Sequence, residues 1–372
     1  MLIGFAASAQ AHDPSAWGGL FRSRDDGGAW LSADAGLFVG AALALAVSPT
    51  DAGHLLYATD TRLLRSRNAG RDWTHEAPAL FNGPTLALAF DRDGNTAWAA
   101  TPAGVFACDA ASVWRKSEIA DAALPARALA AGAAPGHVVL LGSRGVYAST
   151  DHGRRFSRVG QQDLPDAAGR ALLVLPAAPH TLFVVIEGRI WSSADEGRSW
   201  VPRDAGLARA PIEALAVDRD QRDRVWAAGA GRVYVSDDLG AAWRSWGEPA
   251  APSPLSIRGL ATARGGAVIV LATHKGLLRS TDSGATWLQI EGTLPAHLEA
   301  GPLLRDPHDA QTLYAGFSLV PYAELRRRAE QGTDLLSQLD PVSIAGAVAF
   351  LLLLLIGGSL GARTLARAYR ES

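Results

Sequence analysis

A short motif of the form Ser-x-Asp-x-Gly-x-x-Trp recurs along the chain at a nearly constant interval, and this recurrence limits the possible folds more than any other feature. The intact copies comprise Ser23, Asp25, Gly27 and Trp30; Ser193, Asp195, Gly197 and Trp200; Ser236, Asp238, Gly240 and Trp243; and Ser280, Asp282, Gly284 and Trp287. Two copies carry one change each, Asn68 for Asp and Phe156 for Trp. A seventh, degraded copy keeps only Asp109 and Trp114.

Each motif predicts a tight turn between two strands. The Asp and Ser side chains can bond amides of their own turn, and Gly accepts a positive φ. The terminal aromatics are 41 to 44 residues apart, and each interval holds short apolar runs bounded by turn residues, such as 41–48 and 54–59. Four strands in roughly 40 residues is the period of a propeller blade.

The two ends of the repeat complement one another. Residues 301–307 and 312–316 repeat the two inner strands of a blade, but no eighth motif follows them. Residues 18–23 and 30–32 supply a third and a fourth strand that lack inner partners. We therefore predict an all-β, seven-bladed propeller of four-stranded blades over residues 12–320, whose closing blade combines both termini and protects open strand edges.

The repeated motif resembles the Asp-box, or BNR, repeat of sialidases, sortilin ectodomains and the photosystem II stability/assembly factor family. The resemblance implies a propeller over roughly residues 17–320. It leaves function open, because hydrolases and binding proteins share the repeat.

Sequence outside the repeat indicates attachment to a membrane. Residues 1–11 are apolar and end in Ala9-Gln10-Ala11, so they are either the remnant of a signal peptide or an extra strand. Residues 321–340 form a linker that we expect to be partly helical, and residues 341–362 are an uncharged run long enough for a transmembrane helix. The short basic tail, 363–372, favours a cytoplasmic C-terminus. These features predict a single-pass protein of the inner membrane with a periplasmic propeller.

Composition argues against several classes of partner. The net charge is −2 and basic recognition motifs are absent, so we expect no nucleic acid. Cys108 is the only cysteine, which excludes an intrachain disulfide. The nine histidines show no pair at ligand spacing, and we expect no metal and no cofactor.

Enzymatic activity is not indicated by the sequence. A sialidase-like glycoside hydrolase needs an arginine cluster, a Tyr nucleophile with a nearby Glu, and an Asp acid/base at the propeller axis. The predicted inner strands, such as 42–47 and 171–174, are almost entirely Ala, Leu and Val. The motif aspartates belong to separate turns and have a structural role. We therefore expect no catalytic residues, and retain as alternatives a glycoside hydrolase and a sortilin-like receptor with an axial cavity.

A second repeat concerns positive charge. Cations stand before most motif serines, where the second strand of a blade turns into the third, and an aromatic residue joins them from an interblade loop: Arg62, Arg144, Arg189, Arg232, Lys275 and Trp246. These residues are either solvated turn residues or a partner-binding face. The sequence resembles photosystem II assembly factors more than sialidases, and implies a non-catalytic, membrane-tethered scaffold or assembly factor. We expect its partner to be another membrane or periplasmic protein.

Overall fold

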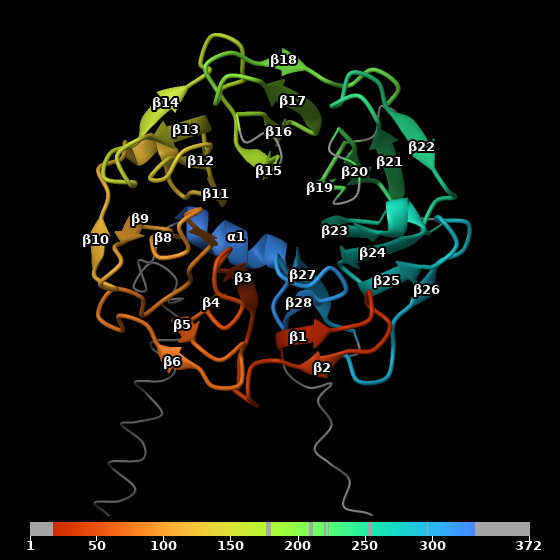
Figure 1. Ribbon diagram of the computed structural model, residues 1–372, viewed down its shortest axis with the longest axis horizontal. Coiled ribbons are helices and arrows are strands. Elements are labelled where there is room, and N and C mark those ends of the chain that lie inside the picture. Colours follow the sequence, from red (N-terminus) through yellow and green to blue (C-terminus); the bar gives the residue numbers. More distant parts are fainter. Residues whose placement is uncertain are drawn as a thin grey trace, which may run out of the picture. The chain divides into compact units, whose positions relative to one another are not determined.

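The computed structural model describes residues 18–175, 180–207, 211–218, 221, 223–251, 255–295 and 297–331. Seven four-stranded antiparallel sheets surround a central axis (Figure 1). The second strand from the axis is buried almost throughout in every blade, because each sheet packs against a neighbour on both faces. The predicted all-β, seven-bladed propeller is confirmed.

In six blades the strands run in chain order from the axis outward. They are β3 (Ala42–Val47), β4 (Leu55–Thr59), β5 (Leu63–Ser66) and β6 (Thr74–His75); β7 (Ala87–Phe90), β8 (Ala97–Thr101), β9 (Gly104–Cys108) and β10 (Trp114–Lys116); β11 (Ala128–Ala131), β12 (Val138–Gly142), β13 (Gly145–Ser149) and β14 (Ser157–Val159); β15 (Gly169–Val174), β16 (Leu182–Ile186), β17 (Arg189–Ser193) and β18 (Val201–Pro202); β19 (Ala214–Val217), β20 (Val225–Gly229), β21 (Arg232–Ser236) and β22 (Arg244–Trp246); β23 (Ile257–Ala263), β24 (Val268–Thr273), β25 (Gly276–Ser280) and β26 (Leu288–Gln289).

The closing blade joins the two ends of the repeat, as predicted. Its inner strands are β27 (Glu299–Arg305) and β28 (Leu313–Ser318), and its outer strands are β1 (Gly19–Ser23) and β2 (Leu31–Ser32). β1 pairs with β28 along its whole length, from Gly19 opposite Phe317 to Ser23 opposite Leu313. The ring is therefore held shut by backbone hydrogen bonds between its two ends.

The motif turns share one hydrogen-bond pattern. In the first, the Ser23 hydroxyl donates to Asp25 Oδ1 (2.7 Å), the Gly27 amide donates to Ser23 Oγ (2.9 Å), and the Ala29 amide donates to Asp25 Oδ1 (2.9 Å). The same pattern recurs in the turns of Ser149, Ser193, Ser236 and Ser280. Each motif Gly has a positive φ of 77° to 88°, the region that other residues seldom adopt. The motif carboxylates are thus committed to their own turns.

The motif tryptophans join neighbouring blades. Trp243 and Trp287 donate their indole N–H to carbonyls of the preceding blade, Arg203 O (2.9 Å) and Glu248 O (3.0 Å). Trp30 instead bonds its own turn at Gly27 O (3.0 Å) and is 1% exposed. Trp287 is only partly buried.

The degraded motif is supported by a buried ion pair. Trp114 donates to Glu76 Oε1 (2.7 Å) in the preceding blade, and the same carboxylate receives two bonds from Arg65 (2.7 Å each). Burial acts to raise the pKa of Glu76, but these hydrogen bonds outweigh it and lower that pKa. The neighbouring Cys108 thiol has a pKa raised to about 11 by burial. The Arg65–Glu76 ion pair therefore anchors Trp114 in a copy of the motif that lacks the Ser and the Gly.

Helix α1 (Tyr322–Gln331) follows the closing blade and lies across one end of the axis (Figure 1). The propeller and the helix up to Glu330 form one compact unit. The predicted signal-peptide remnant 1–11, transmembrane span 341–362 and basic tail 363–372 lie outside the described residues. Within the described ranges, no helix is long and apolar enough to cross a bilayer.

Candidate functional site

The predicted cations lie at the turns between second and third strands, on the face opposite the motif turns. Arg62, Arg144 and Lys275 directly precede β5, β13 and β25, while Arg189 and Arg232 begin β17 and β21. All are exposed except the half-buried Arg62.

These five cations form two groups, those with an acidic partner and those without one. Arg144 and Arg189 contact Asp166 (3.9 Å) and Asp204 (2.5 Å). Arg62, Arg232 and Lys275 have no acidic side chain within ion-pair distance among the residues that the structure describes. These last three, which we call the free turn cations, keep their charge available to a partner.

Trp246 is engaged in packing within the propeller. Its indole N–H donates to Gly266 O (3.2 Å), and its ring lies perpendicular to that of Trp226 with centroids 5.2 Å apart. The Arg244 guanidinium lies over the other face, 4.7 Å from the ring centroid. With these contacts the side chain is half-buried, although the backbone of Trp246 lies opposite Val233, next to Arg232.

A second basic cluster, which the sequence analysis missed, lies beneath α1. We call it the arginine collar: Arg127, Arg170, Arg258 and Arg326. Arg170 and Arg258 belong to the inner strands β15 and β23, Arg127 precedes β11, and Arg326 is on α1.

Three glutamates partly balance the collar. Arg170 pairs with Glu213 (2.7 Å) and Arg258 with Glu299 (2.9 Å). Arg127 pairs with Glu330 of α1.

Irregular strand ends explain why two collar arginines were missed. The register of β15 shifts between Gly169 and Ala171, and that of β23 shifts between Ile257 and Gly259. Such a bulge inserts an extra residue and re-aims its side chain. Arg170 and Arg258 are those inserted residues, and both line the chamber under α1. The regular alternation of side chains between the two faces of a strand does not predict this placement. In the sequence, the position could be suspected only from an arginine that adjoins an apolar run.

The collar carries more positive charge than its glutamates neutralise. The side chain of Arg326 makes no ion pair or hydrogen bond within the described ranges. Although the residue is exposed overall, partial desolvation of its guanidinium and the charges of Arg127 and Arg170 lower its pKa to about 10. Arg127 Nε and Arg258 Nη1 are buried without a hydrogen-bond partner. Unsatisfied buried donors are rare in folded proteins and mark a place where an anion would be favoured.

Tyr322 fixes α1 over the collar. Its hydroxyl donates to Ala42 O (2.6 Å), its amide donates to Glu299 Oε2 (2.8 Å), and its ring lies under the Arg258 guanidinium (5.4 Å). Gly301 makes room for this ring, since a Cβ there would lie 2.1 Å from it. Burial raises the pKa of Tyr322 strongly. The phenol is therefore a protonated donor, unsuited to act as the nucleophile of a sialidase-like site.

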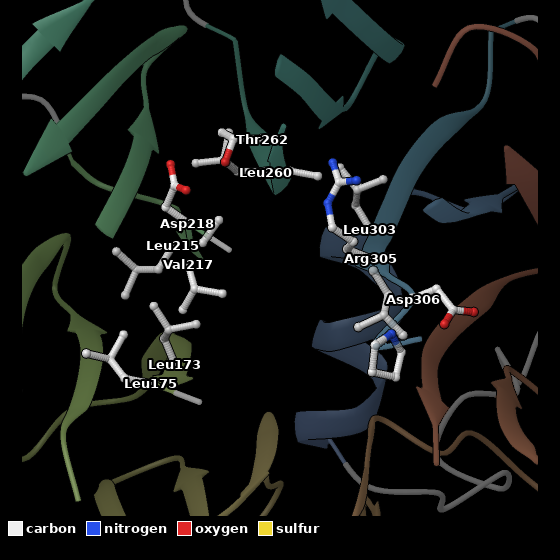
Figure 2. A pocket seen from close by; sticks show the side chains of 14 residues that line it. Leu173, Leu175, Leu215, Val217, Asp218, Leu260, Thr262, Leu303, Arg305 and Asp306 are labelled. Atoms are coloured by element: carbon white, nitrogen blue, oxygen red, sulfur yellow. The ribbon is translucent and has the colours of Figure 1, made fainter. Parts of the chain in front are cut away.

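Two spaces lie along the axis. The α1 chamber, about 260 Å³, is roofed by Tyr322, Ala323 and Arg326. Toward the motif face follows the leucine channel of about 500 Å³ (Figure 2). Its apolar lining includes Leu173, Leu175, Leu215, Val217, Leu260 and Leu303. Figure 2 shows these side chains on two facing walls, with Asp218, Arg305 and Asp306 among the lining residues.

The described residues contain no group of three or more His, Cys, Asp or Glu side chains that could hold a metal ion. What they define is a seven-bladed propeller with a row of cations on one face and an axial channel capped by a helix.

Comparison with known proteins supports this class at the level of the fold. A structure of YCF48 bound to D1 peptide matches with a TM-score of 0.57 at 17% identity, covering 76% of this chain and 94% of that chain. YCF48 from Cyanidioschyzon merolae matches with a TM-score of 0.58 at 13% identity, covering 75% and 96%. No protein-family model and no curated protein matches the chain.

Proposed function

We propose that the chain is a non-catalytic scaffold that binds an acidic segment of another protein during the assembly or stabilisation of a membrane-associated complex. The observation that carries this proposal is the presence of three free turn cations on one face. Cations without an acidic partner favour an anionic surface and speed its encounter. The fold of the YCF48 structures, one of which holds a D1 peptide, supports a peptide-binding use of this propeller class.

Membrane attachment completes the proposal. The uncharged run 341–362 would anchor the propeller, and the basic tail 363–372 would place the C-terminus in the cytoplasm. The propeller would then face the periplasm, close to the inner membrane. Tethering raises the effective concentration of a binding face for a partner in the same membrane. A modest contact through exposed cations would suffice under this arrangement.

A glycoside hydrolase is the less favoured function. The arginine collar at the axis provides one element of a sialidase-like site, but Tyr322 is committed to Ala42 O and the motif aspartates to their own turns. A collar without an available nucleophile suits binding better than hydrolysis.

The test compares two triple variants of the full chain, purified from membranes in mild detergent with their associated proteins. The first replaces Arg62, Arg232 and Lys275 with Ala. The matched control replaces three exposed arginines of motif turns, Arg24, Arg71 and Arg198, with Ala, which removes the same charge from the opposite face. We expect a membrane complex to co-purify with the wild type and the control, and to be lost from the first variant. Equal retention in both variants, or equal loss, would overturn the proposed binding face.

A further inference from the structure

The α1 chamber and the leucine channel are successive layers of the same four inner strands. Each of these strands contributes one residue beneath α1 and, two or three positions further, a leucine to the channel. The pairs are Arg170 and Leu173, Glu213 and Leu215, Arg258 and Leu260, and Gly301 and Leu303. At about 3.3 Å per residue the two layers are separated by roughly 7 to 10 Å. A single elongated ligand can therefore reach both.

The two layers differ sharply in chemistry. The α1 chamber is lined by three arginines, Arg170, Arg258 and Arg326, against a single glutamate, Glu213, and Arg326 has no ion pair in the described part of the chain. The channel is lined mainly by Leu, Val and Ala, and Leu173, Leu215 and Leu303 keep part of their surface accessible. Apolar surface in contact with water gains free energy when an apolar group covers it.

We propose that the axis binds a long-chain carboxylate of the fatty-acid type, with its head in the arginine collar and its hydrocarbon tail in the leucine channel. This proposal goes beyond the scaffold function and is independent of it. Charge complementarity selects the head, because a carboxylate accepts charge-assisted hydrogen bonds from guanidinium groups. The channel selects the tail, because it offers volume and apolar contacts but few polar partners.

The dimensions set the length of the tail. From Arg170 to Leu175 the strand advances five residues, about 16 Å. An extended hydrocarbon advances about 1.3 Å per carbon, given a C–C bond near 1.5 Å. The chamber and the channel together therefore accommodate roughly 12 carbons in extended form, and the channel's volume of about 500 Å³ lies within the range of small-molecule pockets.

Helix α1 controls access from the collar end. The chamber lies directly beneath Tyr322, Ala323 and Arg326, so the carboxylate becomes enclosed once the helix is seated. Seating relies on the Tyr322 bond to Ala42 O and on the Arg127–Glu330 pair. A ligand that supplies the carboxylate for Arg326 would stabilise the seated helix further.

The test measures binding of radiolabelled dodecanoate to the full chain in lipid nanodiscs, with empty nanodiscs as background. Nanodiscs avoid detergent tails, which would compete for the channel. We expect saturable binding at one site, a loss of at least about tenfold in affinity for Arg326→Gln, and no change for Arg328→Gln, because Arg328 lies on the same helix but does not line the chamber.

Two further arms examine the tail. Shorter carboxylates should bind about fourfold more weakly per CH₂ removed, and methyl dodecanoate should bind as weakly to the wild type as dodecanoate binds to Arg326→Gln. Leu215→Trp should abolish binding by filling the channel, and Val217→Leu provides a milder filling variant if the first fails to fold.

Three results would overturn the proposal: binding that persists in a folded channel-filled variant, equal affinity of the Arg326 and Arg328 variants, or partition into the nanodisc lipid only. Leu215→Trp should still co-purify the partner complex, because the free turn cations remain in place. Ligand binding and the scaffold function can therefore fail independently of one another.

Discussion

The two faces of the propeller are built by different means. The motif face repeats one turn, in which Ser and Asp side chains satisfy local amides at nearly identical distances. The α1 face contains no such repeat. It combines shifted strand registers, a helix and long-range ion pairs such as Arg127–Glu330, which joins residues 203 positions apart. Repetition thus stabilises one end of the ring, while the irregular end holds the chemistry with which a ligand could interact.

The largest expected effect is at the motif tryptophans. Trp30→Ala should lower the free energy of unfolding by about 3 to 5 kcal/mol, because the ring is fully buried. Trp287→Ala should cost clearly less, since part of its ring is exposed. Denaturant midpoints of the two variants, measured on the full chain, check this difference. Equal losses would show that copies of the motif are energetically equivalent despite their different burial.

The next effect concerns the degraded motif. Glu76→Ala should destabilise the chain by about 3 kcal/mol, because it leaves the buried Arg65 charge and the Trp114 N–H without their acceptor. Asp109→Ala, in the same motif but exposed, should cost clearly less than Glu76→Ala. Comparing the unfolding midpoints of the two variants measures how far the ion pair replaces the lost repeat. A smaller loss for Glu76→Ala than for Asp109→Ala would contradict this assignment.

A smaller effect is expected at the other face. Tyr322→Phe removes the hydroxyl bond to Ala42 O, worth about 1 kcal/mol, so α1 should open roughly fivefold more often. Hydrogen exchange should accelerate in α1 while amides of the motif turns keep their rates. Acceleration throughout the propeller would show that the helix and the ring do not open separately.

The smallest expected effect is a change in the pKa of one motif carboxylate. Hydrogen bonds from the Thr286 hydroxyl and amide and from Ser280 lower the pKa of Asp282 to about 2. A lowered carboxyl pKa contributes stability above the unfolded value near 3.9, and the contribution is lost as the pH falls from about 4 to about 2. Side-chain NMR should show Thr286→Val raising this pKa toward 3.8. An unchanged pKa in the variant would assign the shift to another group.

The motif face was predictable from the sequence because its signal is local and repeated. Spacing of the motif aromatics predicted seven blades, and the unmatched strands at both ends predicted the closing blade. The α1 face was not predictable from the sequence, because a bulge at Arg170 or Arg258 changes which way a side chain points without changing the composition of the strand. Residues 322–331 were expected to be helical within a linker, but nothing local in them indicates that Tyr322 would pack against Gly301. Partial exposure of Trp287 likewise depends on its neighbouring blade rather than on its motif.

The closing blade also imposes an order in time. β1 and β2 are among the first strands to leave the ribosome, whereas β28, the partner of β1, is the last strand. At about 5 to 20 residues per second, synthesis of the intervening chain takes roughly 15 to 60 s. During that interval the nascent protein is an open arc with two unpaired edges, and it becomes a ring only when the final blade is complete. The period of greatest exposure to aggregation or to chaperones therefore coincides with synthesis itself and ends in a single closure event.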